Sequence, residues 1–147
     1  MKLHAIAVSL LALALSQPSL ADDTPAGKTT ANDVSRKADE TARAVKDYTV
    51  QQRDDAVRHA KAALDDVDAR IHRLETKVDD DWSRMDEAAR RKARATLDTL
   101  RKERNEAAEW YGGLEHGSAE AWDEVKSGFV KSYDSLKESI GKATKSS

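Results

Sequence analysis

Apolar residues recur every three or four positions along most of the chain, which is the spacing of one face of an α-helix. The clearest series alternates these steps as a coiled-coil heptad does, at Val57, Ala60, Leu64, Val67, Ile71, Leu74 and Val78. A weaker series precedes it, from Val34 to Tyr48. Polar residues at 51–55 fall where the apolar stripe would run. We therefore expect one helix over 33–79, with a bend or a poorly packed turn near 51–55.

A second helix is predicted where three adjacent carboxylates end the first. No glycine or proline lies between Lys28 and Tyr111, which favours helix throughout. The repelling acids at 79–81, followed by a capping box from Ser83 to Asp86, indicate a new helix over 83–111 that folds back on the first. The alternative is a continuous rod, about 120 Å long at ~1.5 Å per residue, which needs a partner chain to cover its stripe.

A third helix is predicted over 118–143, after the glycines at 112, 113 and 117 end the second, with Ser118 as its N-cap. This helix has the most amphipathic pattern in the chain. Its apolar side is the candidate interaction face of the protein, formed by Trp122, Val125, Phe129, Tyr133, Leu136 and Ile140. The face suits packing on the stripe of the first helix, at Leu64, Ile71 and Leu74. It equally suits a partner protein or a lipid headgroup layer.

These patterns predict an all-α fold, as an elongated helical hairpin or a three-helix antiparallel bundle or coiled coil over 33–147. The alternative is one long continuous helix followed by a C-terminal amphipathic helix. The length of 147 residues admits one such domain. A flexible tail is expected before it, over 22–32, because Pro25 and Gly27 stand there without any apolar pattern.

The N-terminal sequence predicts export. A basic start is followed by an apolar run from Ala5 to Leu15 and by small residues at Ser19 and Ala21. This pattern is typical of a secretory signal peptide, here 1–21, cut after Ala21. The run is too short for a membrane span, which needs about 20 apolar residues. We therefore expect the mature protein in the periplasm.

Composition narrows the function classes. Charged residues make up 35% of the chain, aromatic residues 5%, and the net charge is −2, so no basic field predicts nucleic-acid binding. Absence of cysteine removes disulfides and thiolate chemistry. No metal-ligand spacing joins the histidines, which are His4, His59, His72 and His116. No nucleophile elbow or phosphate-binding glycine loop is present, so we expect no catalytic, cofactor or metal site.

The only basic cluster is Arg90-Arg91-Lys92-x-Arg94. Asp86, Glu87 and Asp98 flank it at the spacing of helical ion pairs. The pattern therefore favours a solvated face laced with ion pairs, and the alternative is a site for phosphate or anionic lipid.

Three segments carry a resemblance to a known group: Asp47 to Arg53, the helix from Leu64 to Leu74, and the tail from Ala121 to Leu136. The chain resembles small exported bacterial coiled-coil proteins, which are likened to exchangeable apolipoproteins for their amphipathic helices. The resemblance implies a helical fold and a place outside the inner membrane of a Gram-negative bacterium. It implies no activity and no site residues.

Together these observations predict a non-enzymatic structural or interaction module of the cell envelope. Its partner would be a second copy of the chain or an envelope protein. The alternative is amphipathic binding to a lipid surface, or a stress-protective role. No nucleic acid is expected.

Overall fold

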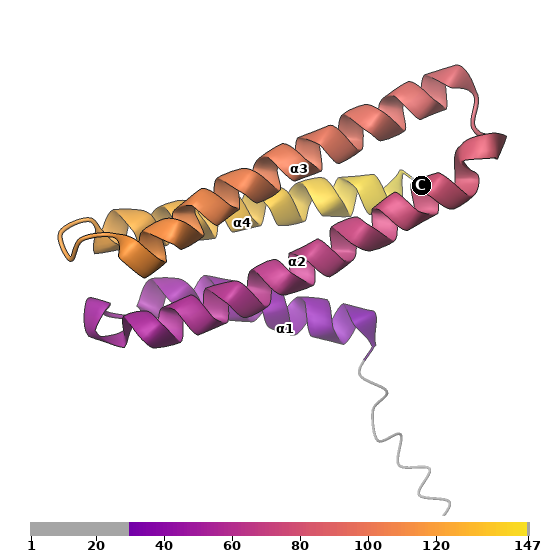
Figure 1. Ribbon diagram of the computed structural model, residues 1–147. Coiled ribbons are helices and arrows are strands. Elements are labelled where there is room, and N and C mark those ends of the chain that lie inside the picture. Colours follow the sequence, from indigo (N-terminus) through magenta and orange to yellow (C-terminus); the bar gives the residue numbers. More distant parts are fainter. Residues whose placement is uncertain (1–29, 147) are drawn as a thin grey trace, which may run out of the picture.

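A computed structural model describes residues 30–146, and this part of the chain is all-α (Figure 1). Its α-helices, which follow one another as antiparallel neighbours in a bundle, are α1 (Ala31–Ala44), α2 (Arg53–Asp81), α3 (Glu87–His116) and α4 (Trp122–Lys145). The predicted signal peptide and most of the predicted tail lie outside the described residues. None of these four helices is long and apolar enough to cross a membrane.

The helix expected over 33–79 is in fact two helices, which corrects the sequence prediction. Two 3₁₀ turns, η1 (Val45–Asp47) and η2 (Val50–Gln52), separate α1 from α2, with extended backbone between them at Tyr48 and Thr49. Thr49 and Gln52 form a capping box, in which the backbone N–H of Thr49 donates to the Gln52 amide oxygen at 3.0 Å. This box stabilises a new helix start. As a result α1 folds back along α2 and becomes a fourth helix of the bundle.

The second turn lies where the carboxylate run predicted it, so the continuous rod is not formed. α2 ends at Asp81, and the short 3₁₀ turn η3 (Trp82–Arg84) leads into α3. The N-cap of α3 is Asp86, whose carboxylate accepts the N–H of Ala89 at 2.7 Å. The expected capping box from Ser83 is wrong, because Ser83 lies within η3 and the extended Met85 separates it from the helix.

The glycine pair at 112 and 113 does not end α3, contrary to the sequence prediction. The helix continues through both residues to His116. Gly113 instead allows close packing of α3 on α4, because a Cβ atom there would lie 3.0 Å from a methyl group of Val125. The turn comes at Gly117, which has extended backbone. Ser118 accepts the N–H of Ala121 at 3.2 Å, but α4 begins only at Trp122.

The core is fullest at the end of the bundle where both the α1–α2 and the α3–α4 turns lie. α2 and α4 each contribute six of its buried apolar residues, and all six residues of the predicted apolar face of α4 are buried. α4 packs chiefly against α3, and the contact with α2 that the sequence predicts is smaller, as is the contact with α1. The indole ring of Trp110 lies against Gly128, where a Cβ atom would overlap it. The glycine thus admits an aromatic side chain between α3 and α4.

A set of hydrogen bonds, hereafter the turn bracket, ties the α1–α2 turn to the α3–α4 turn. The guanidinium group of Arg53 donates to the carbonyl oxygens of Leu114 at 3.1 Å and Gly117 at 2.5 Å. In the reverse direction the indole N–H of Trp122 donates to the carbonyl oxygen of Tyr48 at 2.9 Å. These bonds satisfy carbonyl groups that the turns leave without helical partners.

A buried ionic cluster links α1, α2 and α4 near the middle of the molecule. The carboxylate of Asp39 accepts hydrogen bonds from Arg70 and from the Tyr133 hydroxyl, each at 2.9 Å, and Lys137 lies 3.1 Å away. The Nε atom of Arg70 also donates to Asp66 at 2.6 Å. Burial and the adjacent Asp39 carboxylate raise the pKa of Tyr133, so its hydroxyl stays protonated and acts as a donor. Because each polar group of the cluster has a specific partner, the cluster favours one arrangement of α1, α2 and α4.

Candidate functional site

The predicted interaction face is part of the interior of the protein. Trp122, Val125, Phe129, Tyr133, Leu136 and Ile140 are each at most 8% exposed. Trp122 is further fixed by its hydrogen bond to the backbone of Tyr48 and by the Arg53 guanidinium group 5.1 Å from its ring centre. Binding of a partner through this face stays a prediction, because it requires α4 to leave the bundle.

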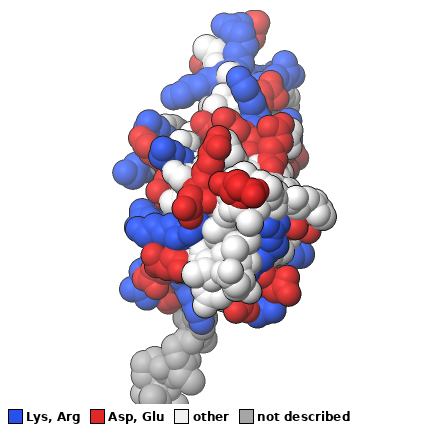
Figure 2. Space-filling model, turned by 90° about the vertical axis from the view of Figure 1, so that its left-hand side faces the viewer, with Lys and Arg blue, Asp and Glu red and all other residues white. Residues whose placement is uncertain are grey.

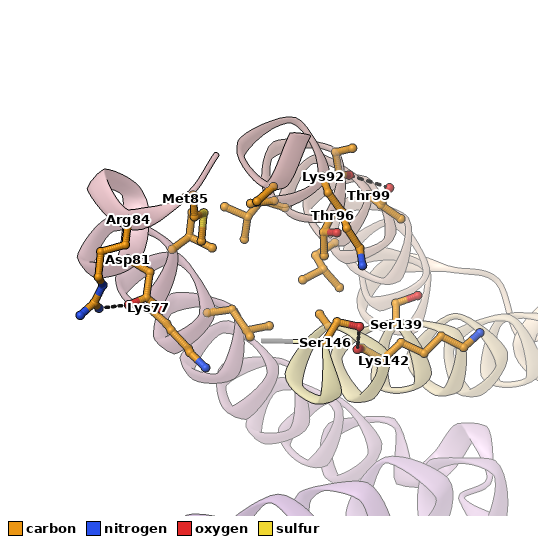
Figure 3. A pocket seen from close by; sticks show the side chains of 18 residues that line it. Lys77, Asp81, Arg84, Met85, Lys92, Thr96, Thr99, Ser139, Lys142 and Ser146 are labelled. Carbon is orange, nitrogen blue, oxygen red and sulfur yellow. Dashed lines mark hydrogen bonds and ion pairs between the residues drawn. The ribbon is translucent and has the colours of Figure 1, made fainter. Parts of the chain in front are cut away.

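The accessible apolar surface lies instead in a cleft at the far end of the bundle (Figure 3). Among residues 30–146, Val34, which is 46% exposed, is the only large apolar side chain that is neither buried nor half-buried. The cleft has a volume of about 890 Å³ and lies between the end of α2, η3, the first half of α3 and the last turns of α4. Its apolar walls are Leu74, Val78, Met85, Ala89, Ala93, Ala95, Leu97, Leu100 and Ala143.

The cleft arises because α4 is too short to cover the end of the α2–α3 hairpin (Figure 1). The apolar stripe of α2 is buried from Ala60 to Ile71, and the next two positions, Leu74 and Val78, are partly exposed. Small side chains on α3 and α4 also help to form the cleft. The faces of α3 and α4 that meet here carry small residues in place of the large ones of the core: Ala89, Ala93, Ser139, Ala143 and Ser146.

Positive charge surrounds the cleft. Its lining includes four basic side chains, Lys77, Arg84, Lys92 and Lys142, and a single acidic one, Asp81. Arg84 forms an ion pair with Asp81, and Lys142 forms one with Glu138 at 2.9 Å. Lys77 and Lys92 have no carboxylate partner within residues 30–146, and they lie on opposite sides of the opening (Figure 3).

The structure separates the predicted basic cluster into different roles. The guanidinium groups of Arg90 and Arg94 lie 5.2 and 4.7 Å from the ring centre of Trp82, as cation–π contacts that brace the α2–α3 turn. Arg91 forms the expected helical ion pair with Glu87 at 2.7 Å. Of this cluster, only Lys92 lines the cleft.

The opposite end of the bundle is acidic. Figure 2 views this end and shows acidic side chains gathered beside a patch of uncharged ones. The α3–α4 turn and the start of α4 supply exposed carboxylates there, at Glu115, Glu120, Asp123 and Glu124. The two ends of the bundle therefore differ. One end is acidic and its interior is packed, whereas the other contains the cleft and the unpaired lysines.

None of the three histidines that the structure describes lines the cleft. His59 shares a 2.5 Å hydrogen bond with the Tyr48 hydroxyl at the other end of the bundle, and His72 and His116 are exposed. Within the part of the chain that the structure describes, no three potential metal-ligating side chains come together. The arrangement at the cleft, an apolar recess with a cationic mouth, has the chemistry of a binding site.

Fold and cleft define the described part of the chain as an antiparallel four-helix bundle with an apolar cleft at one end. Comparison with protein-family models, with curated proteins and with solved structures finds no match to this chain.

Proposed function

We propose that the protein is an exported, non-enzymatic interaction module of the cell envelope, and that the cleft receives an apolar group of its binding partner. One observation supports this above the others: the apolar stripes are covered along most of the bundle and stay accessible in the cleft. Its volume of about 890 Å³ falls within the range of ligand sites, roughly 300–1,000 Å³. The four-helix core holds this recess open without a partner.

Export is supported by the leader pattern of 1–21. The expected mature N-terminus is Asp22, and mass spectrometry of the protein recovered from a periplasmic extract measures it. Recovery of the chain from the cytoplasm with Met1 or its unprocessed leader retained would contradict the envelope location.

Lipid-surface binding through α4 is the second candidate. Its amphipathic sequence favours that role, as in helices that lie in a headgroup layer. The burial of Phe129 and Leu136, each 0% exposed, opposes it, because the helix must first give up its own core. The two candidates differ in what must change on binding: α4 must undock for the second, whereas the cleft is already open.

The test of the cleft uses a neutral apolar fluorophore, N-phenyl-1-naphthylamine, and a matched pair of variants. Ala93→Trp places an indole in the cleft, and Ala88→Trp places one on an exposed position of the same helix outside it. We expect the wild type and Ala88→Trp to bind the fluorophore and Ala93→Trp to lose most binding, with helicity unchanged by circular dichroism. Equal binding by both variants, or none by the wild type, would refute the cleft as the site.

A further inference from the structure

We propose that the occupant of the cleft is an anionic amphiphile with a single alkyl chain, such as a long-chain carboxylate. The alkyl chain would lie between α2, α3 and α4, and the headgroup would meet the ammonium groups of Lys77 and Lys92. This inference rests on the proposed function and adds the chemical class of the ligand.

The walls of the cleft suit an alkyl chain. They are formed by branched aliphatic side chains, one methionine and alanines, and none of the described lining residues is aromatic. An aromatic ligand would gain no ring stacking there beyond the burial of its apolar surface, and a flexible alkyl chain, which needs no stacking, gains fully from burial. Each methylene group that enters such a site raises affinity about fourfold, which is ~0.8 kcal/mol.

The mouth of the cleft suits a single negative headgroup. Lys77 and Lys92 are exposed, lie on opposite sides of the opening and lack carboxylate partners among the described residues (Figure 3). Their alkyl stems extend the apolar wall while the ammonium groups reach water. The only lining carboxylate, Asp81, is already paired with Arg84. A carboxylate or phosphate headgroup therefore meets two cations and no free anion.

Neighbouring charges distinguish this ligand from an extended membrane surface. Exposed carboxylates that do not line the cleft adjoin its lining residues in the sequence, at Asp79, Asp80 and Asp86. They would repel a flat anionic bilayer laid across this end, but they lie outside the lining that a single headgroup contacts. A second copy of the chain is also disfavoured, because Val34 is the only exposed large apolar side chain of residues 30–146 and the others are at least half-buried, so a second copy offers little to fill the cleft.

The experiment compares matched ligands on the mature chain, residues 22–147. Dodecanoate, tetradecanoate and their methyl esters, each as monomers, displace the naphthylamine fluorophore at low and high salt. We expect each carboxylate to bind at least fivefold more tightly than its ester at low salt, with a smaller ratio at high salt. We also expect the longer chain to bind more tightly.

Two double variants test the lysines. Lys77→Gln with Lys92→Gln removes both unpaired cations from the mouth, and Lys37→Gln with Lys102→Gln removes the same charge from exposed positions elsewhere. The first should lower carboxylate affinity about fivefold, as expected for solvent-exposed charge pairs, and leave ester affinity unchanged. The second should change neither.

Each other outcome overturns a defined part of the argument. If the fluorophore binds in the cleft but carboxylate and ester compete equally, the ligand class is wrong and the proposed function stands. If no apolar probe binds, the proposed function fails. Displacement of the fluorophore by phosphatidylglycerol vesicles, but not by monomeric carboxylates, would assign the cleft to a membrane surface. A dimer that Ala93→Trp abolishes would assign it to a second copy.

Discussion

Replacing Gly128 with alanine should destabilise the protein, whereas the same change at Gly141 should stabilise it. Both glycines lie within α4, where alanine gains up to ~1 kcal/mol of helix propensity over glycine. Nothing lies within 4 Å of an added Cβ at Gly141, so that gain is retained. At Gly128 the Cβ would overlap the indole of Trp110, and displacing a packed ring costs about 1–3 kcal/mol. The steric cost exceeds the gain in propensity.

We therefore expect the two variants to differ by about 2 kcal/mol in free energy of unfolding, a difference of roughly 8 °C in melting temperature for a domain of this size. Thermal and urea unfolding followed by circular dichroism measure both values. In a Trp110→Ala background the penalty at Gly128 should vanish, because its cause has been removed. If the two alanine variants are equally stabilising in the wild-type background, Trp110 does not pack on α4 as described.

Three further changes probe the core and the caps. Phe129→Ala should cost about 3–5 kcal/mol in urea unfolding, since the ring is 0% exposed, and a loss below ~1 kcal/mol would mean that α4 is not docked. Arg70→Met should lower the free energy of unfolding by about 3–5 kcal/mol, because Asp39 and Asp66 lose the cation that they share. The control Arg58→Met, which removes an exposed ion pair, should cost under ~1 kcal/mol, and equal losses would reject the buried cluster. Hydrogen bonds from Thr30 lower the pKa of Asp33, so the stability that the Asp33 carboxylate contributes should be present at neutral pH and be lost as the pH falls through that lowered pKa. The measurement is the difference in free energy of unfolding between the wild type and Asp33→Asn across acid pH, and a difference that does not change with pH would refute the prediction.

Helical spacing alone predicted the core positions of α4 and most of those of α2. Side chains three and four residues apart share a face wherever the backbone is helical, so the six apolar residues from Trp122 to Ile140 had to be buried or exposed together. The all-α class followed from the same spacing and from the stretch without glycine or proline.

The sequence pattern predicts a bend or a poorly packed turn near 51–55, but not the complete reversal between α1 and α2, although a signal for it is present. Thr49 and Gln52 have the spacing of a capping box, and the weak stripe at 51–55 concealed a complete reversal of the chain. The glycines at 112 and 113 misled in the opposite direction. Glycine costs a helix ~1 kcal/mol per residue relative to alanine. Close packing of Val125 accounts for glycine at position 113, whereas nothing lies within 4 Å of an added Cβ atom at Gly112.

The cleft was beyond prediction because it depends on the register between helices. Its walls come from α2, α3 and α4, and its volume reflects where α4 ends relative to the α2–α3 turn. The available signal was a change of side-chain size on one face of α4, from Leu136 and Ile140 to Ala143 and Ser146. This change in side-chain size indicates weaker packing near the end of α4, but it does not reveal which residues of α2 and α3 lie opposite.

The turn bracket has a consequence for motion. Arg53 and Trp122 join the two turns at one end in both directions, so separating those turns breaks several hydrogen bonds at once. At the other end the tip of the α2–α3 hairpin extends beyond α4 (Figure 1). We expect this tip to move more readily than the bracketed end, so that amide hydrogens near residues 78–92 exchange faster than those of the helices at the bracketed end. Under the proposed function, such motion would widen the entrance of the cleft for a ligand.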